Sequence, residues 1–136
     1  MGIRARAVLV LGLLVQSATA AGQRPELNDV SAVRIANYGT PSTVINDRTR
    51  VNSIVNELRQ LRGKAWRRGD TRISCYATLV LLRGERALAL FRVRPDFVVE
   101  RAQGKGQSSY SLAAGPSDLP GINALLTAIP PPKDCN

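Results

Sequence analysis

The clearest periodic pattern in the chain is a stripe of apolar side chains with helical spacing between residues 48 and 62. Its members recur at intervals of three and four residues: Val51, Ile54, Val55, Leu58 and Leu61. This spacing places them on one face of an α-helix. Asp47 precedes the stripe as a favourable N-cap, and Gly63 follows it as a stop signal. The pattern predicts an amphipathic helix over residues 48–62.

A second helical stripe covers residues 118–129. Its apolar positions are Leu119, Ile122, Leu126 and Ile129, and Leu125 widens it. Ser117 is the expected N-cap. The proline run at residues 130–132 ends the helix, because proline has no amide hydrogen to donate.

Other segments are typical of β-strands. Runs of β-compatible residues occupy positions 30–38, 72–82, 86–94, 97–101 and 109–112. Gly84-Glu85 joins two of them, with glycine in the first central position as a type II′ turn prefers. Residues 44–45 are either a short strand or an apolar approach to the first helix. We predict an α+β fold with an antiparallel sheet of about four to five strands packed with two amphipathic helices.

The predicted hairpin at residues 72–94 is apolar at consecutive positions near its turn, over residues 79–82 and 87–91. A half-exposed antiparallel sheet would alternate apolar and polar residues. Two explanations remain open. Either one helix covers each face of the sheet, which we favour, or one face of the Arg72–Arg94 hairpin is a surface for self-association.

The first 20 residues have the order of a secretory signal peptide. Arg4 and Arg6 precede an apolar run at residues 7–15, and small residues lead to Ala20. The apolar run is shorter than the roughly 20 residues of a membrane span. We therefore predict a cleaved signal peptide at residues 1–20, a single α+β domain at 21–129 that begins with a polar arm at 21–28, and a proline-rich tail at 130–136. The protein is expected to be exported, periplasmic or extracellular, without a transmembrane anchor.

Two cysteines, Cys75 and Cys135, remain after the predicted leader. An even number of cysteines in an oxidising compartment predicts one disulfide. It would close a loop of about 60 residues and tether the C-terminal tail. A metal or redox site is not expected, because the C-x-x-C spacing and partner ligands are missing. No cofactor is expected either.

The chain is strongly basic, with 19 basic and 10 acidic residues and a net charge of +9. Without Arg4 and Arg6 of the predicted leader the net charge is +7. Such a balance favours acidic partners, here an acidic protein or an anionic envelope polymer, although it also serves solubility alone. Nucleic acid is not an expected partner, because aromatic residues are few and an exported domain seldom meets it.

The sequence contains no histidine, which excludes Ser-His-Asp and Cys-His mechanisms. Asp96 and Glu100 share one strand face, but about 13 Å of strand separates them. Paired glycosidase carboxylates are about 5–9.5 Å apart. We therefore do not expect an enzyme.

A basic loop after the first helix is the candidate binding site. It contains Lys64, Trp66, Arg67, Arg68 and Arg72. Tryptophan and arginine are enriched at binding hot spots. The alternative is that Trp66 packs over a sheet edge while the arginines are solvated. A second basic group, Arg86, Arg92 and Arg94, can share a strand face near Tyr76.

The resulting expectation is a small exported binding domain that engages an acidic protein or anionic envelope polymer, as an inhibitor or accessory factor. The alternative is a self-associating structural or assembly component of the envelope. A histidine-independent hydrolase is the third possibility.

Overall fold

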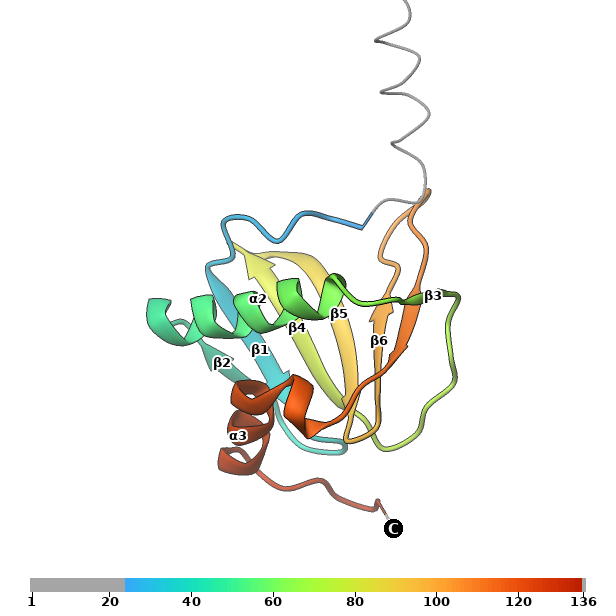
Figure 1. Ribbon diagram of the computed structural model, residues 1–136. Helices are drawn as coiled ribbons and strands as arrows, with labels where there is room; N and C mark the ends of the chain where they lie inside the picture. Colours follow the sequence, from blue (N-terminus) through green and yellow to red (C-terminus); the bar gives the residue numbers. More distant parts are fainter. Residues whose placement is uncertain (1–23, 136) are drawn as a thin grey trace, which may run out of the picture.

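The computed structural model describes residues 24–135 (Figure 1). The predicted signal peptide at residues 1–20 and the first three residues of the predicted arm lie outside this range. None of the helices in the described range combines the length and apolar character needed to cross a membrane.

The core is built on a seven-stranded antiparallel sheet in the order β2-β1-β4-β5-β6-β7-β3. The strands are β1 (Ala32–Ala36), β2 (Thr43–Ile45), β3 (Arg67–Arg68), β4 (Ala77–Arg83), β5 (Arg86–Arg94), β6 (Phe97–Arg101) and β7 (Tyr110–Ala113). The α+β class is confirmed, but the expected four to five strands are too few. The two edges of the sheet are β2, which is the short strand considered as one alternative for residues 44–45, and β3, which was not predicted. They are three and two residues long, too short to show a periodic pattern of their own.

The first helix, α2 (Arg48–Arg62), has the predicted bounds. The Oδ2 of Asp47 accepts a hydrogen bond from the backbone N–H of Arg50 at 3.1 Å, so Asp47 is the N-cap. All members of the apolar stripe are buried.

The second helical segment differs from its prediction. A 3₁₀ turn, η1 (Pro116–Asp118), precedes α3 (Pro120–Ala128). The N-cap position is Leu119, whose side chain cannot cap, and Ser117 belongs to the 3₁₀ turn. Glu57 of α2 replaces the missing cap. Its Oε1 and Oε2 accept from the backbone N–H groups of Gly121 and Ile122 at 2.5 and 3.0 Å.

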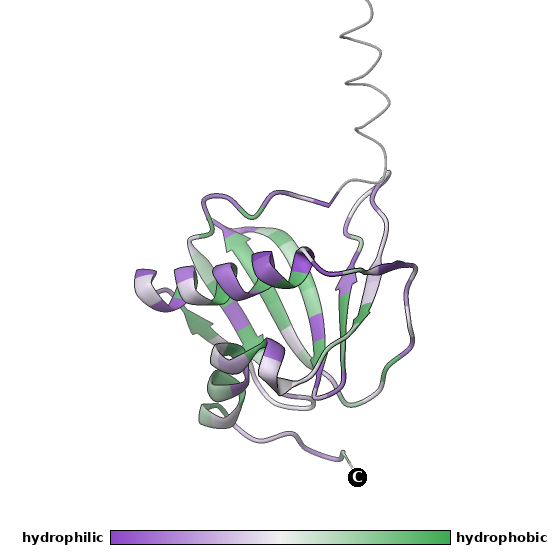
Figure 2. Cartoon of the chain, in the orientation of Figure 1, coloured by the Kyte–Doolittle hydropathy of each residue, from purple (hydrophilic) through white to green (hydrophobic). Residues whose placement is uncertain are grey.

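Both helices lie on the same face of the sheet, with α2 laid across the strands and α3 packed beside it (Figure 1). The expectation of one helix on each face is therefore wrong. The strands that α2 crosses are largely hydrophobic (Figure 2), and buried apolar residues of the strands and of both helices form a single core cluster. Phe91, Leu79, Ile35, Leu58 and Ile122 are completely buried there.

The opposite face, here called the back face, is covered in part by the loop at residues 69–76. Thr71 Oγ1 donates to Ser111 Oγ at 3.0 Å, and Arg94 Nη1 donates to the carbonyl of Ser74 at 2.9 Å. Val99, the neighbour of Ser111 across the β6–β7 pair, is fully buried. The predicted strand at residues 72–82 therefore begins only at Ala77.

A β-bulge in the β4–β5 hairpin changes which arginines share a face. Leu81 pairs with Ala89, whereas Leu82 pairs with Ala87, so Leu88 is an extra residue. The inserted residue shifts the alternation, and Arg86 lies on the face opposite to Arg92. The predicted grouping of Arg86 with Arg92 and Arg94 is therefore wrong for Arg86.

The Cys75–Cys135 disulfide is confirmed, with a Cα–Cα distance of 5.7 Å. The tail is also held by the β1–β2 connection. The backbone N–H of Lys133 donates to the carbonyl of Tyr38 at 2.9 Å, and Asn37 Nδ2 donates to the carbonyl of Pro130 at 3.0 Å. Residues 130–135 are thus held both by the disulfide to Cys75 and by hydrogen bonds to the β1–β2 connection.

Candidate functional site

The candidate loop joins α2 to the sheet edge at β3. Arg67 pairs with Ser111 of β7, and Arg68 pairs with Tyr110. Because side chains alternate along a strand, Arg67 points to the back face and Arg68 to the helix-covered face. The two neighbouring arginines therefore straddle the edge of the sheet.

Trp66 is half-buried and packs against the core. Its Nε1 donates to the carbonyl of Leu61 at the end of α2, at 2.7 Å. The guanidinium of Arg24 covers one side of the ring, 4.3 Å from its centroid. This position matches the interpretation of Trp66 as a residue packed over the sheet edge.

Lys64 contacts a carboxylate of the second helical segment. Its Nζ lies 3.0 Å from Asp118 Oδ1, and Asp118 Oδ2 accepts from the N–H of Gly115 at 3.0 Å. The Gly115 hydrogen bond and then the Lys64 contacts lower the pKa of Asp118 below its ordinary value of 3.8. Lys64 thus fixes the entry to α3 and has a partner within the chain.

A cleft of about 670 Å³ lies between β7 and the loop at residues 69–76, and Arg72 directly follows its lining residue Thr71 in the chain. Arg67 and Arg68 line this cleft together with Phe97, Leu112 and Ser111. Its single lining carboxylate, Asp70, forms an ion pair with Arg101. We call this feature the edge cleft.

The cationic side chains at the edge cleft differ in how far they are engaged. Arg68 donates through Nε and Nη2 to Ser108 Oγ at 2.9 and 2.7 Å. Arg67 and Arg72 are exposed, and neither side chain has a hydrogen bond or ion pair within residues 24–135. Two positive charges therefore stay available to an external anion.

Hydrogen bonds hold the wall of the edge cleft in place. Ser111 Oγ donates to the carbonyl of Gly69 at 2.9 Å, and the N–H of Gly69 donates to the carbonyl of Ser109 at 2.8 Å. The loop is therefore fixed to β7. No group of three potential metal ligands occurs within residues 24–135. The edge cleft offers cationic and apolar contacts, which suits binding.

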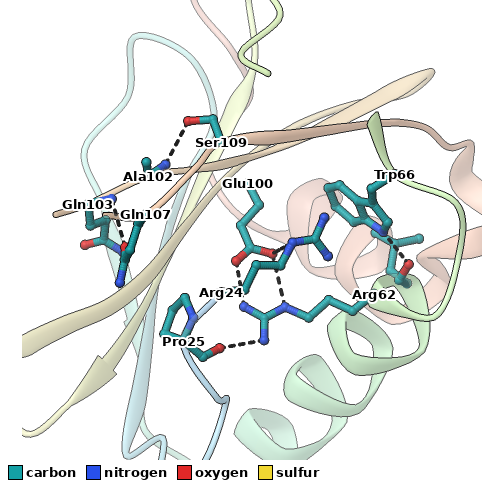
Figure 3. A network of polar contacts seen from close by, with 10 residues as sticks. Arg24, Pro25, Arg62, Trp66, Glu100, Ala102, Gln103, Gln107 and Ser109 are labelled. Carbon is teal, nitrogen blue, oxygen red and sulfur yellow. Dashed lines mark hydrogen bonds and ion pairs between the residues drawn. The ribbon is translucent and has the colours of Figure 1, made fainter. Parts of the chain in front are cut away.

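Sequence reasoning missed a buried ionic cluster around Glu100 (Figure 3). Glu100 is only 3% exposed. Arg62 approaches it with two parallel contacts, Nε to Oε1 at 3.1 Å and Nη2 to Oε2 at 2.6 Å. Arg24 Nε lies 3.7 Å from Oε1. The alternation of β6 carries a usable signal, because it puts Glu100 on the same face as the buried Val98.

Arg24 is also enclosed by aromatic rings. Its guanidinium lies 4.3 Å from the Trp66 centroid and 3.9 Å from the Tyr110 centroid. Burial lowers the pKa of Arg24, while the nearby Glu100 carboxylate opposes this shift. We call Trp66, Tyr110 and Glu100 the guanidinium cage.

Comparisons with protein-family models, with curated proteins and with solved structures find no match to this chain.

Proposed function

We propose that this protein is a small exported binding domain that takes an acidic segment of another protein into the edge cleft. One observation supports this role: the exposed side chains of Arg67 and Arg72 have no acidic partner among the described residues. Arg67 lines the edge cleft, Arg72 follows its lining residue Thr71, and the lining is partly apolar. An inhibitor or an accessory factor would act by binding its partner in this way, without catalysing a reaction.

The charge arrangement favours carboxylates as the ligand groups. A guanidinium binds a carboxylate through two parallel hydrogen bonds, which gives orientation as well as attraction. Each exposed ion pair contributes at most about 1 kcal/mol, so charge alone gives weak binding. The net charge of +7 on the mature chain would raise the association rate with an acidic partner.

The apolar lining favours a protein segment over a purely ionic polymer. Phe97 is half-buried and Ala113 is exposed at the edge cleft, so both have apolar surface that a ligand can cover. Burying apolar surface there contributes about 25 cal/mol per Å². An acidic peptide with apolar side chains would use both kinds of contact, whereas a polyanion would use only the arginines.

Self-association through the back face of the hairpin receives less support. Arg34 and Arg92 occupy that face, and a two-fold contact would bring like charges together.

The test compares charge-matched double variants of the mature chain, residues 21–136. Arg67→Ala/Arg72→Ala removes the free cations at the edge cleft, and Arg48→Ala/Arg50→Ala removes exposed cations on α2. The probes are a labelled peptide of alternating glutamate and leucine, and poly-glutamate of equal charge, measured by fluorescence anisotropy. We expect the edge variant to weaken peptide binding about tenfold, since it removes two charge-assisted contacts.

The α2 variant should bind the peptide within about twofold of the wild type. An equal loss in both variants would mean that net charge alone drives binding and would overturn the assignment of the site. Stronger binding of poly-glutamate than of the peptide would favour an anionic polymer as the partner.

A further inference from the structure

Residues 24–30 form an N-terminal arm that crosses one end of the sheet above α2 (Figure 1). Three arginines of the body donate to its carbonyl oxygens: Arg62 Nη1 to Pro25 at 2.6 Å, Arg59 Nη2 to Leu27 at 2.7 Å, and Arg83 Nε to Asn28 at 3.0 Å. The body thus binds the arm largely through the arm's backbone.

Two side chains anchor the arm. Leu27 is 3% exposed and belongs to the core cluster. Arg24 fills the guanidinium cage: its guanidinium lies beside Trp66 and Glu100 (Figure 3). It also lies over the ring of Tyr110. Backbone acceptors held by fixed donors, with side-chain anchors in pockets, are the features of an extended peptide in a recognition groove. The arm occupies such a groove in its own molecule.

The arm joins the body through a residue in the left-handed conformation. Asp29 has φ = +56°, which costs free energy for residues other than glycine, less for aspartate than for β-branched residues. Two residues later, the N–H of Ser31 donates to the carbonyl of Leu82 at 2.8 Å, where the chain joins the sheet. Asp29 therefore lies at the junction of arm and body, which we call the hinge, and the folded-back arm holds it in the left-handed conformation.

The guanidinium of Arg24 is not fully hydrogen-bonded in the guanidinium cage. Its Nε is buried and has no hydrogen-bond partner in the described residues, because the Glu100 oxygen at 3.7 Å is too distant. Arg62 competes for the same carboxylate. Arg24 is thus the anchor of the arm whose hydrogen-bonding groups are incompletely satisfied within the described residues.

We propose that two copies of this chain exchange their arms, with Arg24 of each copy in the guanidinium cage of the other. Every copy carries both the groove and the segment that fits it. Exchange restores each contact between arm and groove, and an extended hinge frees both Asp29 residues from the left-handed conformation. The contact is isologous and closes at two copies. The guanidinium cage shares no residue with the lining of the edge cleft, so exchange of the arms does not require the edge cleft.

The test uses residues 21–136 with opposite substitutions at the hinge. Asp29→Val disfavours the left-handed conformation, because a β-branched residue is a strong outlier there, and Asp29→Gly removes the strain. Sedimentation velocity over a concentration series gives the dimer dissociation constant. Trp66 is the only tryptophan, so its fluorescence reports whether the cage is filled. Arg24→Ala supplies the emission of the empty cage.

We expect Asp29→Val to lower the dimer dissociation constant at least about tenfold relative to Asp29→Gly, because each dimer relieves two hinges. Its dimer should keep the Trp66 emission of the wild type. Adding Arg24→Ala and Leu27→Ala to Asp29→Val should abolish the dimer.

Three outcomes would overturn the proposal. A monomeric Asp29→Val with the emission of Arg24→Ala would mean that the arm opens without exchange. A monomer with wild-type emission would mean that the arm stays folded back. A dimer that survives the loss of both anchors would place the contact on another surface.

Discussion

At the scale of single residues, Glu100 shows how one charge fixes its surroundings. A buried carboxylate is costly unless hydrogen bonds and opposite charges compensate for its lost hydration. Arg62 supplies two hydrogen bonds, and Arg24 supplies a second positive charge. One carboxylate thereby orients the end of α2, strand β6 and the N-terminal arm.

Glu100→Gln should destabilise the protein by about 3 kcal/mol, because it leaves two largely buried guanidinium groups without their counter-ion. Urea unfolding followed by circular dichroism would give this as a lower midpoint with an unchanged slope. Glu85→Gln in the exposed β4–β5 turn is the control and should shift stability by less than about 0.5 kcal/mol. Equal midpoints for the two variants would contradict the assigned role of Glu100.

At the scale of elements, the start of α3 depends on its neighbour α2. Neither Leu119 nor the proline at position 120 can cap the helix, and Glu57 accepts the exposed N–H groups instead. Gly121 permits this approach, since a Cβ there would lie 3.0 Å from both oxygens of Glu57. The negative charge also complements the positive end of the helix dipole. The two helices are therefore joined by a polar contact as well as by the core.

Glu57→Ala should cost about 1 kcal/mol, the usual effect of losing an N-cap, and should act mainly on α3. Hydrogen exchange would show faster exchange at the amides of Gly121 and Ile122. Gln60→Ala, at an exposed position of the same helix, is the matched control and should leave both amides protected. Unchanged protection in Glu57→Ala would show that core packing alone holds the start of α3.

At the scale of the whole molecule, the disulfide joins the back-face loop to the last residues described. Cys75 lies in the loop at residues 69–76, and Cys135 lies in the proline-rich tail. The bond spans 60 residues, including β4 to β7 and α3. A cross-link over so long a loop restricts the unfolded chain strongly. The tail is thereby made part of the domain.

Cys75→Ala/Cys135→Ala should lower the free energy of unfolding by about 4 kcal/mol on the chain-entropy model. Denaturant unfolding without reductant measures the difference, and the wild type in reductant should match the double variant. A double variant as stable as the oxidised wild type would show that the contacts of Lys133 and Asn37 hold the tail by themselves.

The sequence predicted the bounds of those elements that are determined by residues close together in the chain. Helix α2 combines an apolar stripe with the Asp47 cap, and β5 and β6 are bounded by the turns at Gly84 and Pro95-Asp96, so these elements have the predicted limits. Strand β3 exists only because β7 lies beside it, and the loop at residues 72–76 is strand-like in composition but crosses the back face. The conformations of β3 and of this loop therefore depend on contacts with segments that are distant in the sequence.

The candidate site, too, was predicted from the sequence only in part. The sequence drew attention to Arg67, Arg68 and Arg72 through their type and clustering, yet only the fold showed that Trp66 and Lys64 have internal partners. Glu100 and Arg24 are 76 positions apart in the sequence, and no local pattern relates them. The sequence by itself determined the α+β class, the first helix, the disulfide pairing and the excess of positive charge, because periodicity, capping, cysteine count and composition are properties of neighbouring or counted residues. The tertiary structure decided the seven-strand order, the single helix-covered face, the edge cleft and the guanidinium cage, because each depends on which distant segments pack together.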